Sequence, residues 1–285
     1  MTYDHTSPDV AIPIRNVRFN QGSTSQRRWW HSEDPVQTAF YNALSCTFPA
    51  GEKFFMDSAR RFRDSVDAPL RAQIKAFCGQ EAVHSREHAA FNALASDSGY
   101  DVAALEDRTL KVLNIARKRS PHEQLAATCA LEHFTAILAH ALLADNERDM
   151  QGAPDEIGRL WAWHAMEEIE HKAVCYDTLL AATKDWSSLR RYALRTRTMV
   201  LATAILFGTI GANMATLFKA DGINGPRTWL RVAGFLLGKP GVLRRIAIPY
   251  LTYFRPGFHP WQHDDRDLLA VTEARLGFGA IGAAA

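Results

Sequence analysis

The chain has 285 residues, of which 47% are hydrophobic and 22% charged, a composition typical of a folded globular protein with a substantial core. Its 33 basic and 31 acidic side chains leave a formal charge of +2, which gives no electrostatic indication of a nucleic-acid partner. The four cysteines lie far apart without any CxxC pair, as expected of reduced thiols in a cytoplasmic protein, and the first residues lack the basic-then-apolar order of a secretion signal.

The first part of the chain divides at about residue 34. Residues 1–34 contain Pro, Ser and Arg without any period, which predicts an extended arm that wraps the rest of the protein. From 35 to 183 apolar residues recur at helical spacing, and we see neither a hairpin pattern nor a fixed repeat. Ser120-Pro121-His122-Glu123 has the pattern of a helix start, with Ser as N-cap, Pro in the first turn and the Glu of a capping box.

The composition changes in the last part, residues 184–285, which we predict to be an apolar helical extension packed on the preceding helices. Residues 199–217 carry no charge, and a run of nineteen residues suits either a helix buried across the bundle or contact with a membrane. The segments 228–238 and 242–254 place Arg beside aromatic residues, which suits a membrane surface or a cover over an apolar pocket.

The segment "QEAVHSREHAAFN" (80–92) places polar groups inside an apolar helical stripe. Steps of four and three residues join Leu70, Ile74, Phe77, Glu81, His84, His88 and Phe91. Because both ends of this stripe are apolar, Glu81 and His84 are expected to face the core, where a carboxylate is costly unless it is paired or coordinated. Arg86 and Glu87 fall off the stripe and are expected to face solvent.

The same spacing recurs near residue 170. This second stripe comprises Ile157, Trp161, His164, Glu168, His171, Cys175 and Thr178. Glu168 and His171 repeat the Glu-x-x-His spacing of Glu81 and His84, and side chains three residues apart on a helix can bind one metal ion. Glu167 and Glu170 lie off the line and are expected at the surface or as supporting groups.

Two further helices each offer one inward carboxylate. Glu132 lies on a stripe with Leu125, Cys129 and Ala136, and Glu52 begins a stripe with Phe55. The order Glu52, Glu81-x-x-His84, Glu132, Glu168-x-x-His171 is that of a carboxylate-bridged di-metal bundle. Alternatively, Glu52 binds no metal, and its carboxylate only stabilises the N-terminus of its helix through the helix dipole.

Other side chains are candidates for places around these ligands. His164, one turn before Glu168, is either a third imidazole ligand or a core histidine, and His88 is a supporting or structural residue. His259 lies in a rigid loop that could close over the site or merely stabilise its own turn. The residues predicted to line or shield the site are Phe55, Phe77, Cys129, Phe134, Trp161 and Cys175.

Five segments carry a resemblance to known proteins. "FPAGEKFF", "FCGQEAVHSREHAAFN", "ALEHFTAILAH", "WAWHAMEEIEHKAVCYD" and "RPGFHPW" together resemble a bacterial family of predicted metal-dependent hydrolases, over nearly the whole chain. The ligand pattern is also similar to that of the ferritin-like di-iron arylamine N-oxygenases, in which an added His precedes the last Glu-x-x-His as His164 does here. The spacing between motifs differs from theirs, and the segment after 185 has no counterpart. The resemblance implies an all-α fold, a ferritin-like four-helix bundle with a di-metal core at 35–183 and additional C-terminal helices.

We therefore predict a non-haem di-iron oxygenase or oxidase that uses O₂ to hydroxylate, N-oxygenate or desaturate a small apolar substrate. Its cofactors would be two Fe ions, with Mn or Zn as substitutes, and its partners the substrate and an external electron donor. A two-metal hydrolase of an ester, amide or phosphate is the alternative, disfavoured because the stripes offer few polar groups to hold a substrate. A non-catalytic ferritin-like iron-binding protein is a further alternative. Contact with a membrane surface and a homo-oligomer both stay open.

Overall fold

The computed structural model describes residues 10–20, 27–145 and 149–278, and in these ranges the chain is helical without any strand, which confirms the all-α prediction. The helices are α1 (Pro35–Ser45), α2 (Phe48–Arg60), α3 (Ala68–Asp97), α4 (Val102–Ala116), α5 (Pro121–Ala144), α7 (Asp155–Glu170), α8 (Val174–Ala182), α9 (Ser188–Ala220), α10 (Pro226–Ala233), α11 (Val242–Thr252) and α12 (Arg266–Leu276). Short turns of other helix types occur at Arg63–Ser65, Gly234–Gly238 and Pro260–Gln262.

Local sequence signals account for most helix starts. The predicted capping box is present at α5, where the Ser120 hydroxyl accepts a hydrogen bond from the Glu123 amide and the Glu123 carboxylate accepts one from the Ser120 amide. The Asp34 and Asp67 side chains accept hydrogen bonds from backbone amides in the first turns of α1 and α3, and each is followed by Pro in that turn. These caps satisfy amide groups that have no partner within their own helix.

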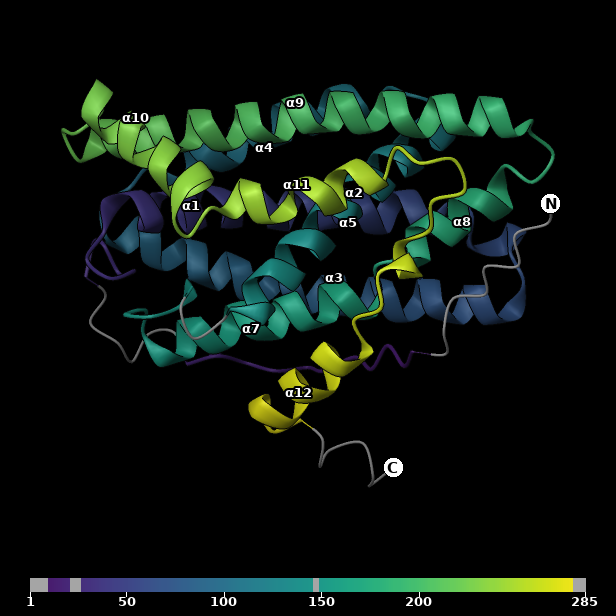
Figure 1. The fold of residues 1–285 in the computed structure, drawn as a ribbon, viewed down its shortest axis with the longest axis horizontal. Coiled ribbons are helices and arrows are strands. Elements are labelled where there is room, and N and C mark those ends of the chain that lie inside the picture. Colours follow the sequence, from purple (N-terminus) through teal and green to yellow (C-terminus); the bar gives the residue numbers. More distant parts are fainter. Residues whose placement is uncertain (1–9, 21–26, 146–148, 279–285) are drawn as a thin grey trace.

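Four helices enclose the centre of the molecule. α2 packs against α3 and α5, and α7 packs against α5 and α3, so each of the four contacts two of the others. α9, the long helix at the top of Figure 1, runs along this group and packs on α1, α4 and α5, while α12 lies against α7 at the opposite side. The stripe predicted as one helix over 157–178 is interrupted, because α7 ends at Glu170 and a turn through His171 precedes α8.

Residues 10–20 form an extended segment that lies along α3 and α7. The Pro13 carbonyl accepts a hydrogen bond from Gln80, the Val17 carbonyl accepts one from Arg86, and the Phe19 amide donates one to Glu87. Glu87 is only 3% exposed. The prediction that it faces solvent is therefore wrong, because this segment covers a helix face that the periodicity alone leaves open.

α9 contains the uncharged run 199–217 and has two different apolar faces. The inward face includes Met199, Ile210 and Met214, each 5% exposed or less, whereas Val200 on the outward face is 58% exposed. By length and composition both α5 and α9 could cross a membrane, but core helices of soluble proteins meet the same criterion. This is weak evidence for a membrane, and in the described residues α9 packs on α1, α4 and α5.

A pair of charge insertions tests this packing. We expect Ile210→Asp to lower the free energy of unfolding by about 3–5 kcal/mol, because it removes core contacts and buries an unpaired carboxylate. Val200→Asp, on the outward face, is expected to change it by no more than about 0.5 kcal/mol. Urea unfolding of both variants measures the difference, and equal losses would contradict the described orientation of α9.

Candidate metal centre

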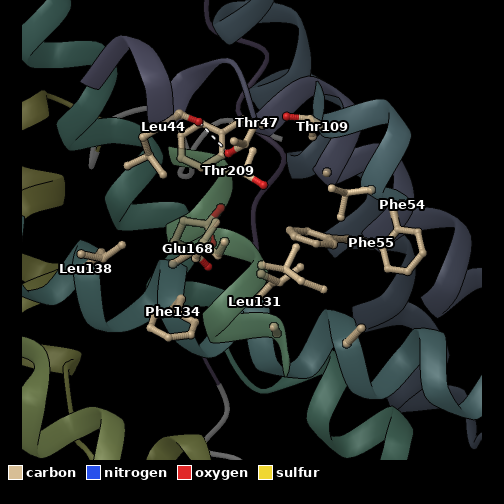
Figure 2. Close-up of a pocket in the computed structure, with 18 of the residues that line it drawn as sticks. Leu44, Thr47, Phe54, Phe55, Thr109, Leu131, Phe134, Leu138, Glu168 and Thr209 are labelled. Carbon is tan, nitrogen blue, oxygen red and sulfur yellow. Dashed lines mark hydrogen bonds between the residues drawn. The ribbon is translucent and has the colours of Figure 1, made fainter. Parts of the chain in front are cut away.

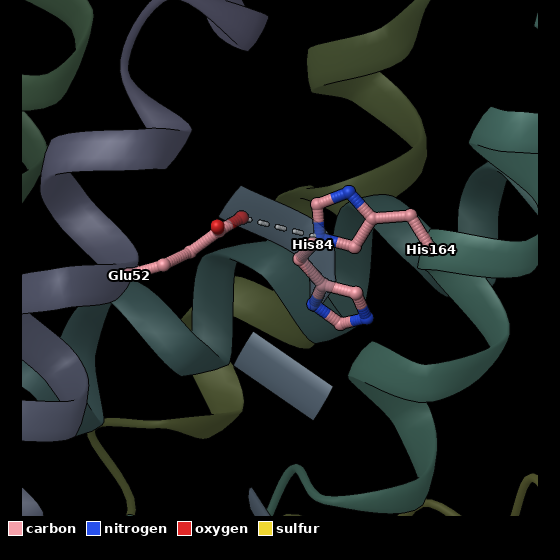
Figure 3. A group of neighbouring side chains, drawn as sticks. All are labelled: Glu52, His84 and His164. Carbon is pink, nitrogen blue, oxygen red and sulfur yellow. Dashed lines mark ion pairs between the residues drawn. The ribbon is translucent and has the colours of Figure 1, made fainter. Parts of the chain in front are cut away.

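Seven buried side chains from α2, α3, α5, α7 and the turn after α7 meet at the centre of the molecule. They are Glu52, Glu81, His84, Glu132, His164, Glu168 and His171, and each is 4% exposed or less. Three overlapping groups, Glu52/His84/His164, Glu81/Glu132/His171 and Glu81/His84/Glu168, each have ligand atoms within 4.8 Å of one another. Figure 3 shows the first group, with Glu52 approaching His164 from the opposite side of the site. Every residue predicted as a ligand is thus placed in one cluster.

The donor atoms of this cluster suit metal ions. Both oxygens of Glu81 and of Glu132, one oxygen of Glu52 and of Glu168, and one ring nitrogen of His84 and of His171 are buried without a hydrogen-bond partner among the described residues. Buried polar atoms are almost always hydrogen-bonded, and buried charges are paired or coordinated. Four carboxylates balance the charge of two divalent cations, so the residues present fit a di-metal site.

Two carboxylates lie between the part of the cluster around His164 and the part around His171. One oxygen of Glu168 lies 2.8 Å from His164 Nε2, and its other oxygen lies 3.6 Å from His171 Nε2. Glu81 belongs to groups on both sides, and its Oε1 lies 3.3 Å from His171 Nε2. These two residues are therefore suited to bridge two ions.

Burial dominates the ionisation of the carboxylates. It raises the pKa of Glu52 to about 8, and together with the neighbouring carboxylates it raises the pKa of Glu81 and of Glu132 well above the usual value. Burial acts the same way on Glu168, but the nearby His171 holds the pKa of that carboxyl well below its usual range. Metal binding would therefore displace protons from this cluster.

The two Glu-x-x-His imidazoles are oriented by hydrogen bonds on their outer nitrogens. His84 Nε2 donates to Glu167 over 3.0 Å, and His171 Nδ1 donates to the Gln80 side-chain oxygen over 2.9 Å. Each bond leaves the other ring nitrogen, Nδ1 of His84 and Nε2 of His171, free to face the cluster. Such bonds set the tautomer and position of a metal-binding imidazole.

The supporting residues are tied together by Arg15, which the sequence pattern did not indicate. Its guanidinium binds Glu167 at 3.1 Å and Glu170 at 2.8 and 2.9 Å. Gln80 also donates to Glu170, over 2.7 Å, and Trp163 donates to Glu167 over 2.9 Å. A usable signal was present: Gln80, Glu167 and Glu170 each directly precede a ligand in the sequence.

His164 is held by a second chain of hydrogen bonds. The Ser45 hydroxyl donates to the Asn92 side-chain oxygen, so His88 Nδ1, 2.8 Å from that hydroxyl, must donate to it. His88 Nε2 is then the acceptor in its 2.6 Å contact with His164 Nδ1. This order leaves a lone pair on His164 Nε2, and burial lowers the pKa of His164 to about 4, which keeps the ring neutral. His164 is therefore suited to be a ligand and His88 to position it.

The remaining candidates are placed around or away from the cluster. The Phe77 ring packs edge-on against His171, with centroids 4.9 Å apart, and Trp161 packs against His88. Cys129 and Cys175 are buried in the core, where burial raises the pKa of both thiols. His259 bonds to Asp177 on α8 and accepts from the Trp261 amide, as a turn-stabilising residue does.

A cavity of about 650 Å³ reaches the cluster from the side covered by α9. Of the seven described ligand candidates, Glu168 and His164 line it. Figure 2 shows Glu168 at its centre among apolar walls that include Leu44, Phe54, Phe55, Leu131, Phe134 and Leu138. Neither Cys129 nor Cys175 lines this cavity, although we predicted both to do so.

Residues 13–264 match the model of a family described as predicted metal-dependent hydrolases. The chain belongs to this family. No curated protein and no solved structure matches it, so the similarity to the ferritin-like arylamine N-oxygenases has no support from known structures. Membership in the predicted metal-dependent hydrolase family agrees with the buried ligand cluster, because both require a metal ion.

Family membership corrects the functional prediction. An oxygenase or oxidase that uses O₂ was the main interpretation, and it is wrong, because the family is one of predicted metal-dependent hydrolases, as in the alternative interpretation. The physical reason for the error is that both chemistries use the same carboxylate and imidazole ligands. Ligand spacing on helices determines where ions bind but not which reaction they promote.

Proposed function

We propose that this protein is a two-metal hydrolase of a neutral carboxylic ester or amide. The observation that carries the proposal is the set of buried, unpartnered oxygen and nitrogen atoms contributed by the seven ligand candidates, in a chain of this family. The four helices α2, α3, α5 and α7 would act as a ferritin-like di-metal bundle, within an organisation of arm (1–34), bundle (35–183) and C-terminal extension (184–285).

The residues divide between two ions. Glu52, His84 and His164 would hold one, Glu132 and His171 the other, and Glu81 and Glu168 would lie between them. When bound, two divalent ions supply Lewis acidity, which lowers the pKa of water and stabilises negative charge on a substrate oxygen. Carboxylate and imidazole donors suit Zn, Mn or Fe(II), and hydrolysis needs no external electron donor.

The apolar cavity favours a neutral substrate. Two of its arginines are paired with acidic residues, Arg197 with Glu123 and Arg245 with Asp149, and the third, Arg119, lies at the exposed end of the lining. None of them offers an unpaired positive charge beside Glu168. A phosphate ester would bring further negative charge to a site already lined by carboxylates. An ester or amide of an apolar acid instead gains free energy from burial of its apolar part against the same cavity walls.

Metal content and turnover of a neutral ester test the proposal together. We expect close to two metal ions per chain, and hydrolysis of p-nitrophenyl butyrate that is abolished by a chelator, restored by Zn, Mn or Fe(II), and equal with and without O₂. Asp64→Ala, at a surface carboxylate with a side chain 78% exposed, should leave both properties unchanged. Hydrolysis that survives complete removal of metal would refute the proposal.

A further inference from the structure

The cavity is elongated along α5. Its α5 lining residues run from Glu123 to Leu142, which at 1.5 Å per residue spans about 28 Å. Glu132, a ligand candidate on the same helix, lies near the middle of this run, and Glu168 and His164 line the cavity from α7. The metal centre therefore opens into the middle of the cavity, which leaves one arm on either side.

One arm opens to solvent between α4 and α9. Ile115, Leu201 and Ile205 line the cavity and are also 62%, 56% and 39% exposed, so they form an apolar rim. Arg119 and Arg197 are the exposed charged residues at this end of the lining. A substrate can enter here with an apolar part inward and a polar part left near the arginines.

The other arm is blind. It ends among side chains from α1, α5 and α11, and Phe40, Tyr41, Leu142 and Val242 are each 8% exposed or less. Arg245 closes this end through its ion pair with Asp149 and a hydrogen bond to the Ala141 carbonyl. From Glu132 to Leu142 is ten residues, or about 15 Å, which is half the ~30 Å hydrocarbon core of a bilayer and thus the length of one lipid acyl chain.

We propose, resting on the hydrolase function above, that the substrate is a long-chain fatty acyl ester. Its acyl chain fills the blind arm, its ester group lies beside Glu168 and His164, and its alcohol part points to the mouth. Water adds to the acyl carbon, the bond from that carbon to the alcohol oxygen breaks, and the proton passes to the departing alcohol. The products are a fatty acid and an alcohol, with no change in oxidation state.

Chain length is the first measurement, made with the metal-loaded enzyme on p-nitrophenyl butyrate, octanoate and palmitate. Each methylene buried in an apolar site contributes up to about a fourfold gain in kcat/KM, so palmitate should exceed butyrate by at least about a hundredfold. Equal kcat/KM for the three esters would overturn the chain-length inference and leave the hydrolase function standing.

A shortened arm is the second measurement. Ala139 lines the blind arm about 10 Å from Glu132, and Ala139→Phe is expected to lower kcat/KM for palmitate at least about tenfold while butyrate changes by less than about twofold. Ala204→Phe, at an exposed alanine of α9 outside the lining, is the matched control and should change neither. If Ala139→Phe loses butyrate hydrolysis, which would indicate that it does not fold, Ala141→Leu at the same end of the cavity takes its place.

Binding separates this inference from the hydrolase function itself. The fluorescent fatty acid cis-parinarate should bind the full-length protein, and Ala139→Phe should weaken its binding at least about tenfold while Ala204→Phe does not. Binding with this pattern but without ester hydrolysis would refute the hydrolase function and keep the acyl-chain arm. Absence of binding, or equal binding by Ala139→Phe and Ala204→Phe, would refute the inference that the blind arm holds an acyl chain.

Discussion

Glu81→Gln is expected to release at least one metal ion per chain and to abolish metal-dependent hydrolysis, because both oxygens of Glu81 face the site and accept no hydrogen bond from the described residues. The same change should stabilise the metal-free protein by about 1–3 kcal/mol, since it removes a buried carboxylate that accepts no hydrogen bond from the described residues. Metal analysis and urea unfolding, with and without chelator, measure the two effects. If Glu81 had a merely structural role, its replacement by Gln would change the free energy of unfolding in the same direction with and without metal.

The pH dependence of this gain follows from the raised pKa of Glu81. Below the ordinary value of 4.5 the carboxyl is protonated in both the folded and the unfolded chain, so Gln should bring little gain. As pH rises above 4.5 the unfolded chain releases its proton first, which destabilises the metal-free wild type and increases the gain from Gln. Asp64→Asn, at the surface, should show neither effect, and a gain that falls with rising pH would contradict the assignment.

Arg15→Met is expected to lower the free energy of unfolding by about 3–5 kcal/mol. Its guanidinium, 10% exposed, is the cation bound to Glu167 and Glu170, whose side chains are 0% and 7% exposed. Removing it leaves two buried carboxylates without their partner, which is the costly way to break a buried ion pair. Since Glu167 orients His84, metal affinity should also fall by about 10–100-fold.

Two variants make the result of Arg15→Met specific. Arg18→Met, at an exposed residue of the same segment, should change stability by no more than about 0.5 kcal/mol. Glu170→Gln added to Arg15→Met should recover part of the lost stability, because it removes one of the stranded charges. Isothermal titration with Zn²⁺ and urea unfolding give both quantities. If Arg15→Met bound metal as tightly as the wild type, the supporting role of residues 10–20 would be wrong.

Local spacing was sufficient to predict the helices and the inward direction of the ligand candidates. Glu81 and His84 are three residues apart on a helix, so their side chains lie on the same face whatever surrounds them. The capping box at Ser120 likewise involves only four consecutive residues. The sequence could therefore indicate which residues line one face of each helix. It could not indicate the break after Glu170, because the apolar pattern continues unchanged across it.

Tertiary structure decided the rest. Arg15 meets Glu167 across 152 residues of chain, and Glu87 is buried by a segment without any periodic pattern, so neither contact leaves a local signal. The blind arm likewise exists only because α1, α5, α9 and α11 pack around one space. The sequence by itself determined helix type and the inward direction of the six ligand candidates that lie on helices, since these depend on the geometry of single turns. The supporting network and the cavity required the packed fold, since they depend on which distant surfaces bury one another.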